Sequence, residues 1–268
     1  MMDSSSWGSV LNSVGWFIPA YLQMRVIHSL VDKISSSQGR FSQDDLEKEL
    51  AQIYNPINLA AMVYHRFPDV PIIQDFRITI EEAIEAHFMG LHHVAMSGLV
   101  PVIEGVGRNF IEARGITEPH KVKDVFTNLT YDIKNEARKR GIGLPDEIDA
   151  MTDSFAHFTN NYLYLKSTSY ALPDKTNRHG ILHGAFQDSD YGKPINFYKI
   201  ISAIEFLTFF LSVDPSFPAQ ISCFAPDSTE ESLKLALYYG NLNGIRASKG
   251  KVYDHSLLSI LKESLKIH

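Results

Sequence analysis

The chain is almost free of cysteine, since Cys223 is the only one among its 268 residues. A lone cysteine cannot form an internal disulfide, and this usage fits a reducing, cytoplasmic setting. No C-x-x-C pair or Cys/His cluster accompanies it, which excludes the usual cysteine-based zinc sites. We therefore expect Cys223 to be a small core residue.

An excess of positive charge is also missing. The chain carries 25 Lys and Arg against 31 Asp and Glu, so its formal net charge is -6. A protein that binds nucleic acid through broad charge attraction is normally basic, and this balance disfavours that class without excluding a local basic pocket. The basic run Lys134 to Arg140 is interpreted as a solvated helix end, with contact to an RNA backbone as the alternative.

Long hydrophobic runs are scarce. The apolar stretch from Val14 to Leu22 is short and contains Pro19, whereas a transmembrane helix needs about 20 apolar residues. The N-terminus opens on Asp3 and serines rather than on a basic segment followed by an apolar one, so no signal peptide is predicted. We expect a cytoplasmic protein without a membrane partner.

Helical periodicity is present nearly throughout, and no alternating strand pattern with hairpin turns accompanies it. At 44% hydrophobic residues the chain can build a substantial core. From Thr79 to about Ala113, apolar residues recur every three or four positions, which predicts one long amphipathic helix. We expect Pro101 to kink this helix near Ser97 and Gly115 to end it.

Other periodic segments predict further helices, several with capping or stop signals. They are Trp16–Val31, broken or started near Pro19, Phe41–Tyr54 capped by Ser42 with Asp45, Pro56–Tyr64, a helix capped by Thr117 and ended by Gly141, Pro145–Tyr162, Pro194–Val213, a short helix from Ser228 to Tyr239 ended by Gly240 and Gly244, and Asp254–Ile267. The fold class is therefore all-α: a four-helix bundle core over 77–213, an N-terminal helical extension over 1–76, and C-terminal helices over 214–268 that pack on the bundle.

The segment Asn177 to Gly184 reads N-R-H-G-I-L-H-G and concentrates the chemistry of the chain. The Arg178 guanidinium is always charged and presents a planar fork of donors that suits phosphate. His179 and His183 can exchange protons near neutral pH. Together these groups could cleave RNA without a metal or cofactor: a histidine would be the general base or acid, and Arg178 would stabilise the developing charge.

Helix geometry restricts how this motif can work. Residues five apart in a regular helix are about 140° out of phase, so Arg178 and His183 could not then face one phosphate. They could if Arg178 lies at or before a helix start, which the capping residue Asn177 favours. They could also do so if two subunits supply a pair of motifs, and Gly180 and Gly184 would leave room for a close partner backbone.

Two other interpretations of the motif stay open. Arg178 and His183 could be a polar helix start with a core-facing histidine. Alternatively, His179 and His183 could share a helix face as metal ligands, with Asp188 and Asp190 as nearby further candidates. A second histidine group lacks the spacing of a metal motif and consists of His87, His92 and His93.

Several segments together resemble a bacterial branch of the HEPN proteins over about residues 77–213. They are Arg77 to His87, Val102-Ile-Glu-Gly, N-R-H-G-I-L-H-G, and Asp190-Tyr-Gly with Asn196; Trp16-Phe-Ile-Pro, outside that span, is also similar. Arg178 and His183 match the R-x-x-x-x-H motif of that family. His179 occupies the polar position that often follows the arginine. Glu104 belongs to a helix that packs near the motif in the family, and it could orient Arg178 or His183.

The resemblance implies an all-α bundle that dimerises so that two motifs form a composite active site at the interface. It implies a metal-independent endoribonuclease acting on RNA, in phage defence or toxin-like growth control, with an antitoxin or regulatory partner. Some members have lost catalysis. The alternative is therefore a catalytically inactive HEPN-like module for dimerisation or for binding a nucleotide or protein partner.

Overall fold

The computed structural model describes residues 4–117, 119, 121–215 and 225–252. All regular secondary structure in these residues is helical, which confirms the all-α fold class. Cys223 and the predicted helix Asp254–Ile267 lie outside the described residues.

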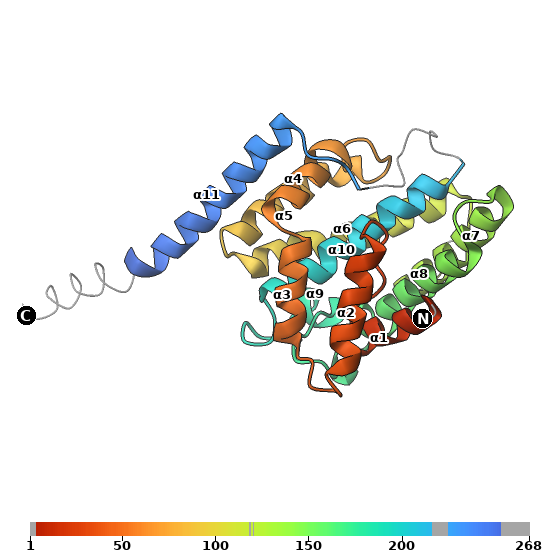
Figure 1. Ribbon diagram of the computed structural model, residues 1–268, viewed down its shortest axis with the longest axis horizontal. Coiled ribbons are helices and arrows are strands. Elements are labelled where there is room, and N and C mark those ends of the chain that lie inside the picture. Colours follow the sequence, from red (N-terminus) through yellow and green to blue (C-terminus); the bar gives the residue numbers. More distant parts are fainter. Residues whose placement is uncertain (1–3, 118, 120, 216–224, 253–268) are drawn as a thin grey trace, which may run out of the picture.

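The helices follow one another through the described residues (Figure 1). They are α1 Ser4–Ser13, α2 Met24–Ser36, α3 Gln43–Ile53, α4 Pro56–His65, α5 Arg77–Phe88, α6 His92–Ala113, α7 Val122–Arg140, α8 Pro145–Phe158, α9 Arg178–Leu182, α10 Pro194–Val213 and α11 Glu230–Val252. A single π-turn, Thr159–Leu163, continues α8, and short 3-10 turns lie at Gln74–Phe76 and Ser167–Ser169.

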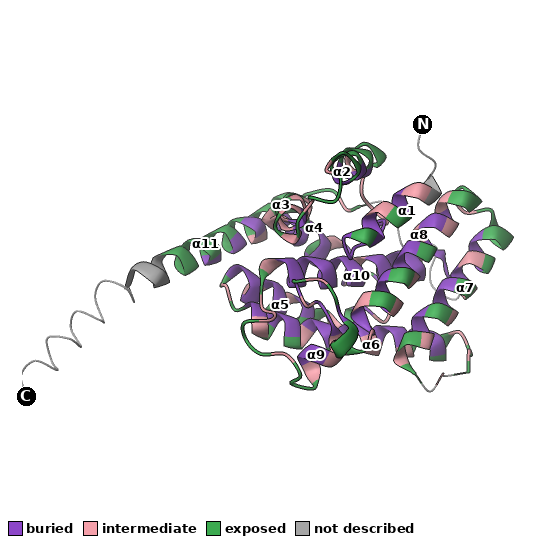
Figure 2. Ribbon diagram, turned by 90° about the horizontal axis from the view of Figure 1, so that it is seen from below, coloured by how far each residue is buried: buried purple, intermediate pink, exposed green. Residues whose placement is uncertain are grey.

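Helix α10 lies at the centre of the molecule, and α3, α6 and α7 pack against it. Figure 2 shows α10 buried along its length among the surrounding helices. A helix that is apolar on all sides belongs in a core or in a membrane. Of the described helices, α10 alone is long and apolar enough to cross a membrane, and 89% of its apolar window is buried, as in the core helix of a soluble protein.

Helix ends with local sequence signals lie where the sequence predicts them. Ser42 and Asp45 form a reciprocal capping box at the start of α3, and the Asn55 side chain caps α4. Gly141 ends α7 with φ +64°, a left-handed conformation that glycine adopts without strain. These ends need only neighbouring residues, so the sequence alone determines them.

The predicted long helix from Thr79 to Ala113 is wrong, because the chain forms two helices there. Gly90 takes φ +78° between α5 and α6. The backbone N–H groups of Gly90 and Leu91 donate to the carbonyls of His87 at 2.9 Å and Ala86 at 2.7 Å. This is a glycine helix end of the usual kind. Helix α6 then continues through Pro101, so the glycine and not the proline divides the segment.

Two predicted helix starts are also wrong. Trp16 lies in the loop between α1 and α2, fully buried, and its indole Nε1 donates to the Ser202 hydroxyl at 3.0 Å. Tertiary packing on α10 thus fixes this apolar segment as a loop. Helix α7 starts at Val122, and Thr117 does not cap it.

The C-terminal region differs from its prediction as well. Helix α11 does not end at Tyr239; it passes through Gly240 and Gly244 to Val252. A glycine inside a helix costs only about 1 kcal/mol relative to alanine, and α11 packs along α4 and α5. That packing outweighs the local preference for a break.

One hydrophobic core crosses all three predicted ranges. Trp16, Phe206 and Tyr239 belong to the same cluster of buried side chains. Helix α1 packs on α8, α3 on α10, and α11 on α4 and α5 (Figure 1). The helices before and after 77–213 therefore contribute to the core that positions the motif.

Candidate functional site

Asn177 fixes the start of the motif helix α9. Its side-chain Oδ1 accepts the backbone N–H of Gly180 at 2.9 Å, so it is the predicted cap. Its Nδ2 donates to the carbonyls of Tyr162 at 2.8 Å and Leu165 at 2.7 Å. These carbonyls lie at the end of the π-turn that follows α8, where the last carbonyls of a helix have no backbone N–H of a following turn to accept from. Asn177 is fully buried and ties the two segments together.

Arg178 is the first residue of α9, and His183 lies just past its last residue. The backbone of His183 is no longer helical, with φ -99° and ψ 9°. The 140° phase difference of a regular helix therefore does not apply. The guanidinium Nη1 of Arg178 lies 2.6 Å from His183 Nε2 and 3.3 Å from His179 Nδ1. One chain thus brings the three predicted catalytic residues together without a second copy.

Glu104, on α6, meets the other edge of the same guanidinium. Its two carboxylate oxygens accept from Nε and Nη2 of Arg178, the second at 3.3 Å. The exposed fractions are 17% for the Arg178 side chain and 15% for that of Glu104. A two-point contact fixes the plane of the guanidinium as well as its position. Glu104 therefore directs Nη1 of Arg178 toward the two histidines.

The protonation of the histidines follows from their partner. A guanidinium only donates hydrogen bonds, so His179 Nδ1 and His183 Nε2 must accept from it and carry no proton in this arrangement. Partial burial and the adjacent Arg178 charge lower the pKa of His179. The two rings lie nearly parallel, 17° apart with centroids separated by 5.7 Å, and His183 is exposed to solvent. The cluster therefore offers an unprotonated nitrogen beside a fixed cation.

Tyr164 lies close to this cluster and carries no signal in the sequence beyond an aromatic packing residue. It is buried, and its hydroxyl has no hydrogen-bond partner among the described residues. Burial, with a smaller contribution from the Glu104 charge, raises the pKa of Tyr164 well above its ordinary value. The π-turn after α8 sets the position of the Tyr164 side chain, and no local sequence pattern predicts that turn.

A buried ion pair holds the loop that leads into the motif. Lys199 Nζ on α10 lies 2.9 Å from the Asp174 carboxylate, and both side chains are fully buried. Burial would raise the pKa of Asp174, but Lys199 and the Thr176 hydroxyl more than offset this effect and lower it. The Asn196 amide adds bonds to the Asp174 carbonyl at 2.6 Å and to Thr176 Oγ1 at 2.8 Å.

Sequence reasoning missed Asp174 and Lys199. The available signal was the lysine itself, one of two charged residues, with Glu205, in a strongly apolar helix. A charged group in such a helix needs a buried partner of opposite sign.

The two motif glycines play different roles. A Cβ on Gly180 would lie 2.1 Å from the ring of Phe186. The space beside Gly180 is therefore filled by its own chain, and the expectation that it accommodates a partner backbone is wrong. Gly184 has φ +65° with open space around it, so it serves the turn after α9.

The metal alternative gains no additional ligand from the neighbouring aspartates. The Asp190 carboxylate accepts the backbone N–H of Gln187 at 2.9 Å, and the Asp188 carbonyl contacts His93 Nε2 at 3.2 Å. No group of three or more His, Cys, Asp and Glu residues in the described part of the chain is arranged to hold a metal ion.

His87 and His92 belong to the core. Both are buried, and His87 stacks on Phe197 with ring centroids 3.8 Å apart. Burial lowers the pKa of His87 well below its ordinary value and that of His92 to about 4.

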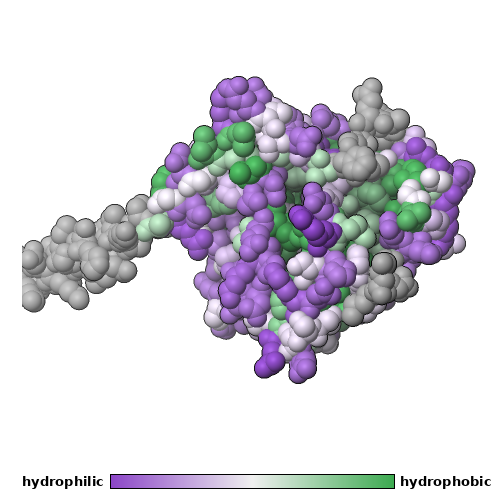
Figure 3. Space-filling model, in the orientation of Figure 1, coloured by the Kyte–Doolittle hydropathy of each residue, from purple (hydrophilic) through white to green (hydrophobic). Residues whose placement is uncertain are grey.

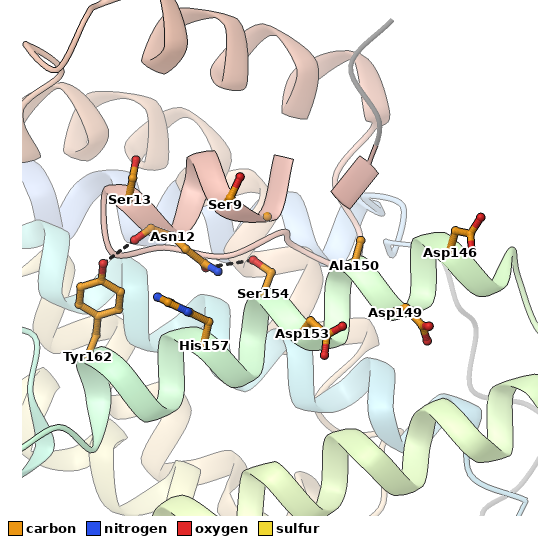
Figure 4. Close-up of a pocket in the computed structure, with 11 residues that line it drawn as sticks. Ser9, Asn12, Ser13, Asp146, Asp149, Ala150, Asp153, Ser154, His157 and Tyr162 are labelled. Atoms are coloured by element: carbon orange, nitrogen blue, oxygen red, sulfur yellow. Dashed lines mark hydrogen bonds between the residues drawn. The ribbon is translucent and has the colours of Figure 1, made fainter. Parts of the chain in front are cut away.

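A cavity of about 740 Å³ opens between α1 and α8 (Figure 4). Ser9 and Ser13 line one side, and the acidic face of α8 lines the other. Asp149 and Asp153 of that face pair with Arg138 and Lys134 on α7. None of the predicted site residues lines the cavity.

Comparisons with known protein families, curated proteins and solved structures found no match. A functional interpretation therefore depends on the geometry of Arg178, His179, His183 and Glu104.

Proposed function

We propose that the chain is a metal-independent endoribonuclease of the HEPN type, with Arg178, His179 and His183 as its catalytic residues. The supporting observation is the 2.6 Å contact between Arg178 Nη1 and His183 Nε2 at an exposed position. Cleavage of a phosphodiester needs a cation for the phosphate and a proton-transfer group within reach of it. A His183 buried in the apolar core would have removed this support.

The reaction would follow from an exchange of partners. A bound phosphate oxygen takes the place of His183 as acceptor for Arg178 Nη1, which frees the Nε2 lone pair. His183 then accepts the proton of the ribose 2′-OH as the 2′ oxygen attacks phosphorus. The 5′ oxygen leaves with a proton from a water molecule, and the proton held by His183 then neutralises the hydroxide, so the products are a 2′,3′-cyclic phosphate and a 5′-OH. His179 keeps its contact with Nη1 of Arg178 and helps to hold the guanidinium at the phosphate. Arg178 stabilises the charge on the phosphorane.

Glu104 acts through Arg178 in this proposal. Its carboxylate accepts from Nε and Nη2, so it orients the guanidinium without contacting substrate.

The family resemblance supports three further proposals. They are a homodimer with a composite active site, a role in defence or toxin-like growth control, and an antitoxin or regulatory partner. Expression of wild type and His183→Ala in a host, with and without phage challenge, tests that role. No difference in growth or phage yield between the two would contradict it.

The assay that tests the enzyme is RNA cleavage in the presence of EDTA. We expect wild type to produce cyclic phosphate ends and His183→Ala to lose at least about 100-fold in rate, the usual contribution of a general base. His157→Ala removes another exposed histidine, outside the motif, and should cleave like wild type. Equal activity of wild type and His183→Ala would refute the proposal.

A second function is favoured by the ion pair itself. Glu104 already neutralises Arg178 along one edge, and the net charge of the chain is negative. This arrangement suits a catalytically inactive HEPN-like module for dimerisation or for binding a nucleotide or partner, in which Arg178 and His183 are structural. Thermal melts distinguish the two: a large loss of stability in His183→Ala, with no cleavage by wild type, supports the inactive module.

A further inference from the structure

A second cavity, of about 440 Å³, opens between α2, α3, α4 and α10. Figure 3 looks onto this side of the molecule and shows hydrophobic surface in a hollow near the middle of the face. Its apolar lining includes Leu22, Val26, Leu30, Ile53 and Met62. The volume falls in the range of sites for small organic molecules, about 300 to 1,000 Å³. The lining is therefore large enough and apolar enough for the body of such a molecule.

Glu205 brings a carboxyl group into this apolar lining. It lies on α10, whose neighbouring residues are buried, yet it keeps partial exposure and lines the cavity. The Tyr54 hydroxyl donates to its Oε2 at 2.7 Å, which fixes the group in place. Burying a carboxyl among apolar side chains is costly unless the charge is compensated. Within the fold, the Tyr54 hydrogen bond and the charge of the buried Arg66 compensate it only in part, since burial remains the largest influence on its pKa.

The charge around the cavity points to the sign of its occupant. Glu49 also lines it and pairs with Lys33 at 2.7 Å. None of the described lining residues is basic. Arg66 lies outside the lining, with its guanidinium over the Tyr21 ring at 4.6 Å and an exposed fraction of 3%. An anion would meet carboxylates here, whereas a cation would meet Glu205 and the aromatic rings.

Glu205 is also poised to change its charge near neutral pH. Burial raises its pKa to about 7, while the Tyr54 hydrogen bond and the Arg66 charge act in the opposite direction. A cation placed beside the carboxylate would favour the ionised form. Binding of a cation at pH 6 would therefore release a proton from Glu205 to the solvent.

We propose that this cavity binds an organic ammonium ion, with its charged head on Glu205 and its apolar body against Val26 and Ile53. An ammonium donates a charge-assisted hydrogen bond to the carboxylate. The Tyr54 ring adds an attraction between cation and aromatic ring, whereas the Tyr21 ring already carries the Arg66 guanidinium. The proposal is independent of the ribonuclease function, since Glu205 takes no part in the motif cluster.

The test uses three probes of one shape and different charge: phenethylamine, 2-phenylethanol and phenylacetate. Binding to the full chain is measured by isothermal titration calorimetry at pH 6 and pH 8. We expect phenethylamine to bind at least tenfold more tightly than the alcohol, and phenylacetate not to bind. The amine should bind more tightly at pH 8, and at pH 6 its heat should vary with the buffer because a proton is released.

Three variants locate the site. Glu205→Gln keeps the shape and an acceptor for Tyr54, and it should abolish the preference for the amine over the alcohol. Glu49→Gln removes the other lining carboxylate and should keep that preference within threefold. Val26→Trp fills the cavity and should block both probes, which tests the site even if Glu205→Gln does not fold. Wild type without saturable amine binding, or with equal affinity for amine and alcohol, would overturn the proposal, as would an unchanged preference in Glu205→Gln.

Discussion

At the scale of single residues, Asn177 joins two segments around the motif. Its side chain caps α9 and holds carbonyls at the end of the π-turn, and it is fully buried. Asn177→Ala removes a cap worth about 1 kcal/mol and takes the Nδ2 donor from the Tyr162, Leu163 and Leu165 carbonyls, of which that of Tyr162 keeps the Leu165 N–H at 3.4 Å. A buried carbonyl that loses its donor costs about 1 to 3 kcal/mol. We expect a loss of about 3 kcal/mol in the free energy of unfolding, measured by urea denaturation.

Asn160→Ala is the matched control for that measurement. The Asn160 amide makes one exposed hydrogen bond, to the Thr127 hydroxyl, so its loss should cost no more than about 0.5 kcal/mol. Equal costs for the two asparagines would mean that Asn177 does not hold the loop.

Glu205 predicts a pH dependence of stability at the same scale. Its pKa of about 7 in the folded chain lies above the value of about 4.3 in an unfolded one. The folded state then binds the extra proton, so this group lowers stability as pH rises between those values. His87 and His92 have lowered pKa values and act in the opposite direction below pH about 6.5. Chemical denaturation from pH 4 to 8 should therefore show Glu205→Gln gaining stability over wild type as pH rises. A constant difference between them would contradict the prediction.

The residue scale also shows what the sequence could predict of the site. Asn177 is identifiable as a cap because its partner Gly180 is three residues away. The contact between Arg178 and Glu104 joins residues 74 apart, and no periodicity encodes it. Only the family resemblance suggested that pairing. Asp174 and Lys199 stayed hidden because their role depends on where α10 meets the loop before α9.

At the scale of helices, two glycines on α6 test how local propensity competes with packing. A Cβ at Gly98 would make ordinary contacts of 3.7 and 3.8 Å, whereas at Gly105 it would lie 2.5 Å from the Phe76 ring. Both changes to alanine gain about 0.5 to 1 kcal/mol of helix propensity. We expect Gly98→Ala to raise the melting temperature and Gly105→Ala to lower it. Stabilisation by both would show that Phe76 moves aside freely.

The same contrast explains which helices the sequence predicts. Ends with a capping side chain or a left-handed glycine depend on neighbouring residues, and the cap Ser42, the start at Pro56 and the stop at Gly141 are correctly predicted. Gly90 ends α5, whereas α11 continues through Gly240 although it is the same residue type. The difference lies in packing with distant helices, and single-sequence patterns do not contain that information.

At the scale of the whole molecule, the Lys199–Asp174 pair connects elements that are far apart in the chain. Besides Asp174, Lys199 Nζ donates to Gln43 Oε1 on α3 at 2.7 Å. The Gln43 amide in turn donates to the Val14 carbonyl in the loop after α1 at 2.9 Å. The N-terminal region, α10 and the loop before the motif therefore share one buried polar network. Removing one charge from this network should therefore destabilise all three of these segments.

Lys199→Met tests this connection, because it leaves the Asp174 carboxylate buried without its cation. We expect a loss of about 3 to 5 kcal/mol in the free energy of unfolding, measured by urea denaturation at pH 7. Asp174→Asn in the same background removes the stranded charge, so the double variant should be more stable than Lys199→Met alone. Since the folded pKa of Asp174 is lowered, the contribution of the pair is complete above its unfolded pKa of about 3.9 and is lost as pH falls through the folded value. If the double variant instead lost as much stability as the two single variants together, the two charges would not depend on each other. The motif loop would then be held by Asn177 and Asn196 alone.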